Sequence, residues 1–310
     1  MAMSADVILA LLPIVLLIML GMGLRRLGFL AEGFWPQAER LSYYVLVPCL
    51  FFHSLATAKL DALPARELAT TLILSILAVA ALLVALRPVL RVDGPTFTSI
   101  FQGGIRFNNY VGVTLAAGLF GAQGIALAAL CSAAIVPTVN ILCVLVFARH
   151  GSARLSGRGI ARQLVTNPLV LGSFAGIGFQ LLGLGLPSGV EPALRALGAA
   201  SLPLGLLCVG AALEFGSLRG WMAPVATSSA IKFLAMPVVT VLVASLMGLT
   251  GPALVTALLF QALPTASSAY IMARQLGGDA PLMAGITAMQ TLFALFALPI
   301  AAAGIGALAA

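Results

Sequence analysis

Long apolar segments separated by short polar loops run along almost the whole chain. We count ten of them, and a helix of about 20 residues suffices to cross the roughly 30 Å hydrocarbon core of a bilayer. Their approximate ranges are 7–24, 41–58, 68–86, 95–120, a fifth after a turn at 121–124, a sixth ending near 184, 194–213, 221–247, 252–276 and 282–305. An amphipathic loop with Trp35 and Pro36 is expected between the first two. The pattern predicts an all-α polytopic membrane protein with ten transmembrane helices.

Two of these segments are interrupted by polar and helix-breaking residues. The fourth contains Phe-Gln-Gly-Gly-Ile-Arg-Phe-Asn-Asn-Tyr-Val-Gly at 101–112, and the ninth contains Phe-Gln-Ala-Leu-Pro-Thr-Ala-Ser-Ser at 260–268. Interrupted helices at corresponding places in two halves are typical of a substrate site near the bilayer midplane. We therefore expect helical hydrogen bonding to be lost near 103–109 and 264–267. The two breaks should meet within about 15 Å, half the thickness of the core.

The chain divides into two halves at the basic loop that holds Arg149, Arg154, Arg158 and Arg162. Residues 1–150 and 151–310 each contain five predicted spans, and Pro48 in the second span matches Pro203 in the seventh. Because five is an odd number, the second half must be inverted relative to the first. The sequence thus predicts two inverted five-helix repeats.

The basic residues predict the orientation of the protein in the membrane. The chain is 61% hydrophobic and 8% charged with a formal net charge of +7, whereas an ordinary soluble domain is about 25% charged. One side of the predicted topology carries Arg25, Arg26, Arg40, Arg87, Arg91, Arg149, Arg154, Arg158, Arg162, Arg219 and Arg274, and the other carries Lys59, Arg66 and Arg195. By the positive-inside rule the first side is cytoplasmic, so both termini face outward. Basic residues in short loops between spans are typical of membrane orientation and do not indicate nucleic-acid binding. The location that we expect is the bacterial inner membrane.

Arg106 and Lys232 are the charged residues that lie deep within predicted spans. A charge near the bilayer centre costs about 2.5–3.5 kcal/mol on insertion scales and is usually functional. All nine acidic residues fall in loops or at helix ends, so no carboxylate within a span is an evident partner. Either an anionic substrate completes the pairing, or backbone carbonyls and water solvate both cations.

The other candidate residues are polar or helix-breaking positions near the two interruptions. Those after each break can bind a carboxylate or satisfy freed backbone groups, and His53, Asn140 and Gln290 more often form interhelical hydrogen bonds. The candidate substrate-binding set is Arg106, Asn108, Asn109, Thr114, Asn140, Lys232, Pro264, Thr265, Ser267, Ser268 and Gln290. The four cysteines lie in apolar segments without metal-ligand spacing, so we expect neither a metal nor another cofactor.

The chain resembles the auxin efflux carrier family along its whole length. The motifs are Asn-Tyr-Val-Gly-Val-Thr at 109–114, Gly-Leu-Phe-Gly at 118–121, Ile-Lys-Phe-Leu-Ala-Met-Pro at 231–237, Leu-Pro-Thr-Ala-Ser-Ser at 263–268, Ala-Arg-Gln-Leu-Gly-Gly-Asp at 273–279, Thr291 and Leu-Pro at 298–299. Thr114 stands where the family usually has proline, which makes the first break depend on its glycines.

This resemblance to the compact prokaryotic members implies an elevator-type carrier that forms a homodimer. Spans 1, 2, 6 and 7 would be a scaffold, and spans 3–5 and 8–10 a moving transport domain. The family's substrates are organic anions, either dicarboxylates such as malate and malonate or indole-type weak acids.

We therefore expect a secondary transporter of small organic anions, working by export or uniport. The sequence lacks a Gly-Lys-Ser/Thr nucleotide-binding motif. A membrane-embedded enzyme is disfavoured because there are no paired deep acids, and a sensor because the longest loop is too short for an output domain. Sodium- or proton-coupled symport is the alternative within the class. Uniport is favoured because coupling sites usually use an acid within a span.

Overall fold

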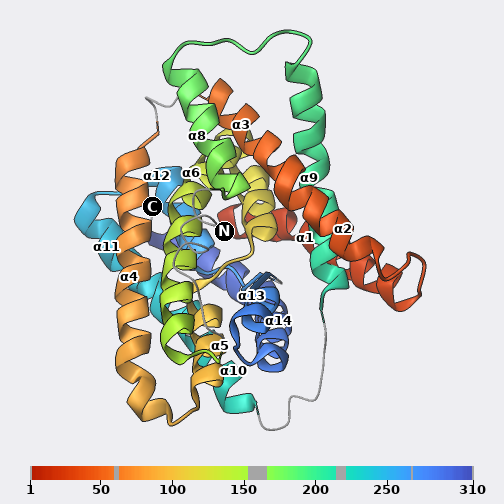
Figure 1. Cartoon of the computed structure of the whole chain (residues 1–310). Helices are drawn as coiled ribbons and strands as arrows, with labels where there is room; N and C mark the ends of the chain where they lie inside the picture. The colour runs from red at the N-terminus through yellow and green to blue at the C-terminus, as the bar shows by residue number, and fades with distance from the viewer. Residues whose placement is uncertain (1, 59–62, 153–165, 214–220, 267, 309–310) are drawn as a thin grey trace.

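The computed structural model describes residues 2–58, 63–152, 166–213, 221–266 and 268–308, and all regular elements in those ranges are helices (Figure 1). The helices are α1 (Ala2–Arg26), α2 (Phe34–Leu41), η1 (Ser42–Leu46), α3 (Val47–Thr57), α4 (Ala65–Leu90), α5 (Gly94–Ile105), α6 (Asn109–His150), α8 (Pro168–Leu181), α9 (Glu191–Ala211), α10 (Met222–Ala230), η3 (Ile231–Ala235), α11 (Met236–Met247), α12 (Gly251–Gln261), α13 (Ser268–Leu276) and α14 (Ala280–Leu308). Within the described ranges, four helical stretches are long and apolar enough to cross a membrane: Ala65–Leu90, Gly94–His150, Glu191–Ala211 and Met222–Met247. The all-helical fold is thus confirmed and is consistent with a polytopic membrane protein, whereas the ten spans and the inverted repeat stay predictions.

One local expectation was wrong: Trp35 and Pro36 lie inside helix α2, and the loop ends before them. The amphipathic pattern is that of a short helix, because Trp35 is buried while its neighbours are exposed. Single π-helical turns, η1 and η3, precede Pro48 and Pro237. Proline has no backbone N–H and clashes with the carbonyl four residues earlier, and a wider turn relieves both problems.

Helix α6 reverses direction at Gly121, as the predicted turn at 121–124 requires. Gly121 has φ 56° and ψ −134°, a conformation that a side chain strongly disfavours. The Ser132 hydroxyl donates to Asn109 Oδ1 at 2.6 Å although 23 residues separate them, a span of about 35 Å along a straight helix. The two arms of α6 therefore pack side by side.

The N-terminal helix packs directly on α9, and α3 packs on both α8 and α9. A Cβ atom added at Gly21 would lie 2.0 Å from the Leu207 carbonyl oxygen, and one at Gly210 would lie 1.9 Å from the Ile18 oxygen. Such close backbone approach is typical of small residues between membrane helices. Helices α1, α3, α8 and α9 thus form one closely packed group. Helices α4 and α11, which pack on each other, lie toward the opposite edge of the molecule (Figure 1).

Both predicted breaks are present, and they meet. Helix α5 ends at Ile105 and α6 begins at Asn109, with extended backbone at Arg106 (φ −76°, ψ 160°). In the second half, α12 ends at Gln261 and α13 begins at Ser268. The Thr265 hydroxyl lies 3.1 Å from the Gly103 carbonyl oxygen, well inside the expected limit. Gly103 itself remains helical, so the first break begins three residues later than expected.

Candidate functional site

A buried hydrogen-bond network joins the two breaks through Gln290 of α14. The Gln290 Oε1 atom accepts from the Thr265 backbone N–H at 3.0 Å and lies 2.8 Å from the Thr265 hydroxyl. Its Nε2 atom donates to the Gly103 carbonyl at 3.0 Å and to the Ser228 hydroxyl at 3.2 Å. Backbone groups freed by a broken helix must be satisfied from within the protein in a membrane. Gln290 supplies that satisfaction, so its amide holds the crossing together.

The repeated Phe-Gln pair places one buried glutamine near the end of each first half-helix. Gln102 donates to the Ala269 carbonyl at 3.4 Å, and Gln261 donates to the Leu72 carbonyl at 3.3 Å. Each glutamine therefore ties its half-helix to a helix far away in the sequence. The pair has a structural role at the crossing.

Arg106 extends from the first break toward α6 and the second break. Its Nη1 donates to Asn140 Oδ1 at 3.0 Å and approaches the Met272 sulfur at 3.4 Å, and its Nη2 donates to the Ser268 hydroxyl at 3.3 Å. These partners are all uncharged, and within the described ranges no carboxylate pairs with the guanidinium. Arg106 thus keeps a full positive charge available to a ligand.

Asn108 and Asn109 are held in different ways at the start of α6. The Asn108 Oδ1 atom caps the helix by accepting from the N–H groups of Tyr110 at 3.1 Å and Val111 at 3.4 Å. Its Nδ2 group is buried and has no hydrogen-bond partner among the residues that the structure describes. Asn109 accepts from Ser132 instead. Asn108 therefore presents an unused donor next to Arg106.

These groups face a small cavity of about 70 Å³ between the breaks and the closely packed group of helices, which we call the central cavity. It is lined by Glu39, Tyr43, Val47, Arg106, Phe107, Asn108, Asn109, Tyr110, Val136, Val139, Asn140, Leu169, Val209, Ala266 and Ser268. One wall comes from α2, η1, α3, α8 and α9, and the other comes from the two breaks and α6. The cavity thus lies at the seam between two groups of helices.

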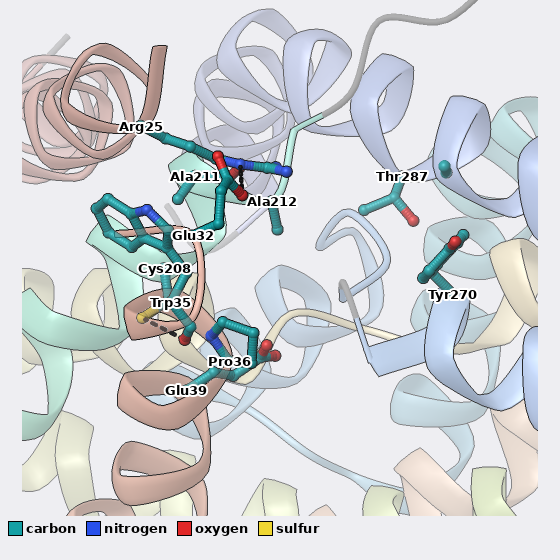
Figure 2. A pocket seen from close by; sticks show the side chains of 11 residues that line it. Arg25, Glu32, Trp35, Pro36, Glu39, Cys208, Ala211, Ala212, Tyr270 and Thr287 are labelled. Carbon is teal, nitrogen blue, oxygen red and sulfur yellow. Dashed lines mark hydrogen bonds and ion pairs between the residues drawn. The ribbon is translucent and has the colours of Figure 1, made fainter. Parts of the chain in front are cut away.

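The described residues also line at least three larger cavities, two of which we name. The first, of about 210 Å³, is lined by residues that include Arg25, Glu32, Glu39, Tyr270 and Thr287, and Figure 2 shows Tyr270 and Thr287 across it from the others. We call it the Arg25 cavity. The second, of about 590 Å³, includes His53 and Arg195 in its lining and is called the His53 cavity. In the predicted topology the Arg25 cavity opens to the cytoplasm and the His53 cavity to the outside.

The structure brings some predicted site residues together and separates others. Arg106, Asn108, Asn109, Asn140 and Ser268 line the central cavity. Five others lie elsewhere: Thr265 and Gln290 are buried in the crossing network, Pro264 is buried in the second break, Thr114 donates to the Tyr110 carbonyl, and Lys232 is buried in η3. Ser267 lies outside the described residues. The Lys232 ammonium has no hydrogen-bond partner among the described residues.

Sequence reasoning missed several polar residues at or beside the central cavity, among them Tyr110 at the start of α6. Glu39 and Tyr43 line it from α2 and η1, and Asn167 donates to the Tyr43 hydroxyl at 3.2 Å while capping α8. Tyr43 and the Asn-Pro sequence at 167–168 were visible as polar positions beside apolar segments. Glu39 was grouped with the other acidic residues in loops or at helix ends, where none was an evident partner within a span.

Comparison with known proteins supplies the family. The family described as "Membrane transport protein" matches residues 6–302. A Rhizobium meliloti (strain 1021) protein named "Putative malonate transporter" is 27% identical over 251 residues, covering 76% of this chain and 75% of that protein. An "Uncharacterized transporter" of Methanothermobacter thermautotrophicus is 25% identical over 293 residues, covering 93% of this chain and 95% of that protein. The chain therefore belongs to the membrane transport protein family, as its resemblance to the auxin efflux carriers indicated.

Proposed function

We propose that this protein is a secondary transporter of small organic anions that binds a carboxylate group at Arg106 in the central cavity. The observation that carries this proposal is that the Arg106 guanidinium faces a cavity. Its hydrogen-bond partners among the described residues are all uncharged. A planar guanidinium suits a carboxylate because it can donate two parallel hydrogen bonds. Asn108 Nδ2, buried and without a partner in the described ranges, adds a third donor.

The size of the central cavity favours a short aliphatic acid. One water molecule takes about 10–15 Å³ of such a cavity. The volume of about 70 Å³ therefore holds roughly five to seven waters, which suits a dicarboxylate such as malonate better than an indole-type acid. The name of the Rhizobium meliloti relative points to the same substrate class.

We further propose an elevator cycle in which α1, α3, α8 and α9 form the scaffold and dimer surface, while α4–α6 and α10–α14 move. Two packing pairs support the inverted repeat beneath it. Helix α1 (span 1) packs on α9 (span 7), and α3 (span 2) packs on α8 (span 6). In a repeat of five spans, span 1 corresponds to span 6 and span 2 corresponds to span 7. The pair of spans 1 and 7 therefore corresponds to the pair of spans 6 and 2, as a twofold relation between repeats requires. The proposed location is a bacterial inner membrane.

Uptake by proteoliposomes tests the proposed function. We expect vesicles with the purified protein to accumulate labelled malonate and malate faster than an indole-type weak acid, with excess unlabelled malonate abolishing the signal. Empty vesicles and vesicles with the Arg106→Gln variant are the controls. Uptake of all three compounds at the rate of empty vesicles would overturn the proposal, as would an Arg106→Gln variant that transports at the parent rate.

The same vesicles address coupling. The sequence favours uniport, and a membrane potential is worth about 2.3 kcal/mol per charge per 100 mV, enough to drive an anion out of a cell that is negative inside. Uptake that rises with a sodium gradient at clamped voltage would instead show sodium symport. The remaining alternative is proton-coupled symport, for which the carboxyl group of Glu39 is relevant.

A further inference from the structure

Glu39 lies between the central cavity and the Arg25 cavity, as the one described residue that lines both. Its side chain lines both cavities, and it is the acidic residue in the described lining of the central one. Figure 2 shows the Glu39 carboxyl group at the edge of the Arg25 cavity. A ligand carboxylate held by Arg106 therefore shares a cavity of about 70 Å³ with the carboxyl group of Glu39.

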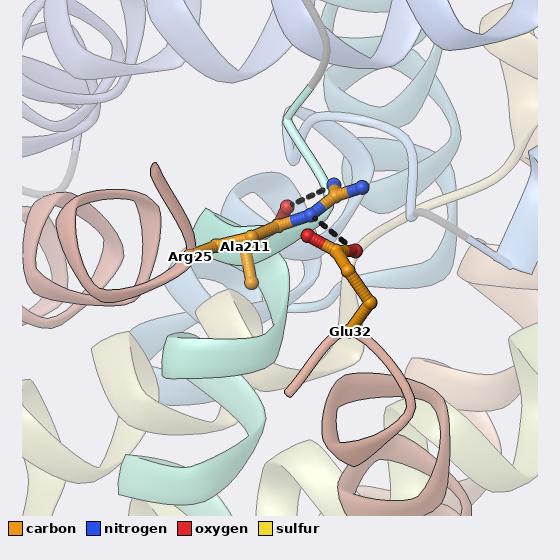
Figure 3. Close-up of polar contacts among 3 residues, drawn as sticks. All are labelled: Arg25, Glu32 and Ala211. Carbon is orange, nitrogen blue, oxygen red and sulfur yellow. Dashed lines mark hydrogen bonds and ion pairs between the residues drawn. The ribbon is translucent and has the colours of Figure 1, made fainter. Parts of the chain in front are cut away.

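The other charged groups of the Arg25 cavity have partners of their own. Arg25 Nε lies 3.3 Å from Glu32 Oε2, and Arg25 Nη1 donates to the Ala211 carbonyl at 2.6 Å (Figure 3). No cation of the described residues forms an ion pair with Glu39. The Glu39 carboxyl group is thus left to interact with whatever enters the central cavity.

Apart from Arg106 and the paired Arg25 and Glu32, the residues that line these two cavities with Glu39 are neutral. Tyr43 comes from η1, Tyr110 from α6, Cys208 from α9 and Tyr270 from α13. The Tyr110 hydroxyl is buried and has no hydrogen-bond partner among the described residues. Glu39 precedes the second span, and burial raises its pKa above the ordinary glutamate value. These surroundings favour a carboxyl group that holds or shares a proton.

We propose that Glu39 shares one proton with the second carboxylate of a bound dicarboxylate, so that the protein selects the singly protonated form of its substrate. This inference rests on the proposed function. Two carboxylates in one small site cannot both ionise without strong repulsion, and a single proton between them removes it. One end of the substrate then binds Arg106 as a carboxylate, and the other end donates an O–H to Glu39 or accepts one from it. No covalent bond is made or broken, and the proton travels with the substrate.

Calorimetric binding of malonate and propionate at about pH 5.5 and about pH 7.5 tests this proposal. Both values lie above the ordinary pKa of a glutamate side chain, about 4.3, whereas the second carboxyl group of free malonate loses its proton within this range. Propionate is the matched ligand because it lacks the second carboxyl group. We expect the parent to bind malonate at least about tenfold more weakly at the higher pH, a change of about 1.4 kcal/mol. Propionate binding should change less than about threefold, or about 0.7 kcal/mol.

Two variants separate Glu39 from general effects. In Glu39→Gln, the amide N–H donates to the second carboxylate without a proton, so malonate binding should lose its pH dependence and strengthen at the higher pH. Glu32→Gln removes the neighbouring carboxylate that is paired with Arg25 and should keep the parent's pH profile. Thermal unfolding of each variant checks that it is folded.

The outcomes are distinguishable. A parent that binds neither ligand at either pH would overturn the proposed function itself. If the parent and Glu39→Gln bind malonate with the same pH profile, the proposal of a shared proton is wrong, whereas the proposed function stands. A profile that also disappears in Glu32→Gln would assign the effect to the Arg25 cavity and contradict the role of Glu39.

Discussion

Arg106 is the residue on which anion binding depends in the proposed site. Removing one partner of a desolvated, hydrogen-bonded charge pair costs about 2–5 kcal/mol. We therefore expect Arg106→Gln to weaken malonate binding at least about thirtyfold, since every 1.4 kcal/mol is a factor of ten. Lys232→Met should do less, because the Lys232 ammonium lies outside the lining of the central cavity and would serve as a positive counterweight. Calorimetry on the purified variants measures both effects.

Arg195→Gln is the matched control for that experiment. Arg195 lines the His53 cavity and is absent from the lining of the central cavity, so its loss should leave malonate affinity unchanged. If Arg106→Gln binds malonate like the parent while remaining folded, the arginine is structural and the anion site lies elsewhere.

The sequence predicted the polar residues of the site unevenly, and the reason is visible at single positions. Arg106 and Asn108 were found because a cation and an amide inside an apolar segment require an explanation. Gln290 was also found for that reason, yet its amide is used up by Thr265 and Gly103. Glu39 was missed because its position at a helix end gave no sign of the cavity that tertiary packing builds beside it.

At the scale of elements, the crossing depends on the absence of a side chain at Gly103. A Cβ atom there would lie 2.1 Å from the Ser228 hydroxyl oxygen and 2.7 Å from Ile286 Cγ2. We expect Gly103→Ala to destabilise the protein by about 1–3 kcal/mol, as overpacked cores do. It should also displace Gln290 from the network. Thermal unfolding in detergent measures the first effect.

Gly178→Ala supplies the comparison for this substitution. Gly178 lies in helix α8, and an added Cβ there would meet nothing within 4 Å. Alanine in a helix is worth about 1 kcal/mol over glycine, so this variant should be as stable as the parent or more so. A Gly103→Ala protein that unfolds at the parent temperature would contradict the close packing at the crossing.

Element boundaries followed from hydropathy, whereas the contents of the breaks did not. Pro264 lies inside the second break, and the paired asparagines at 108–109 mark the start of α6 after the first break. The sequence could not show that Gln290, from a helix near the C-terminus, joins the two breaks. The π-helical turn before Pro48 was equally hidden, because proline usually marks a kink and gives no information on how the turn adapts.

At the scale of the whole molecule, the distribution of arginines predicts that the loop between α1 and α2 is cytoplasmic and that the α8–α9 loop faces outward. In a Cys49→Ala background, Ser188→Cys should react with an impermeant maleimide in right-side-out spheroplasts. Ala31→Cys should react only after permeabilisation. Both positions are exposed, whereas Cys131, Cys143 and Cys208 are buried. The reverse labelling pattern would mean that the orientation is wrong.

The central cavity has one wall on the closely packed helices and the other on the crossing. In the proposed cycle, the substrate must lose its contacts with Tyr43 and Leu169 on the first wall before it can move with the second wall. Affinity and speed are then opposed: each contact made to the first wall lengthens the time that the substrate stays in place. An anion that binds both walls tightly would block the movement and act as an inhibitor. A rapidly transported substrate should therefore bind weakly.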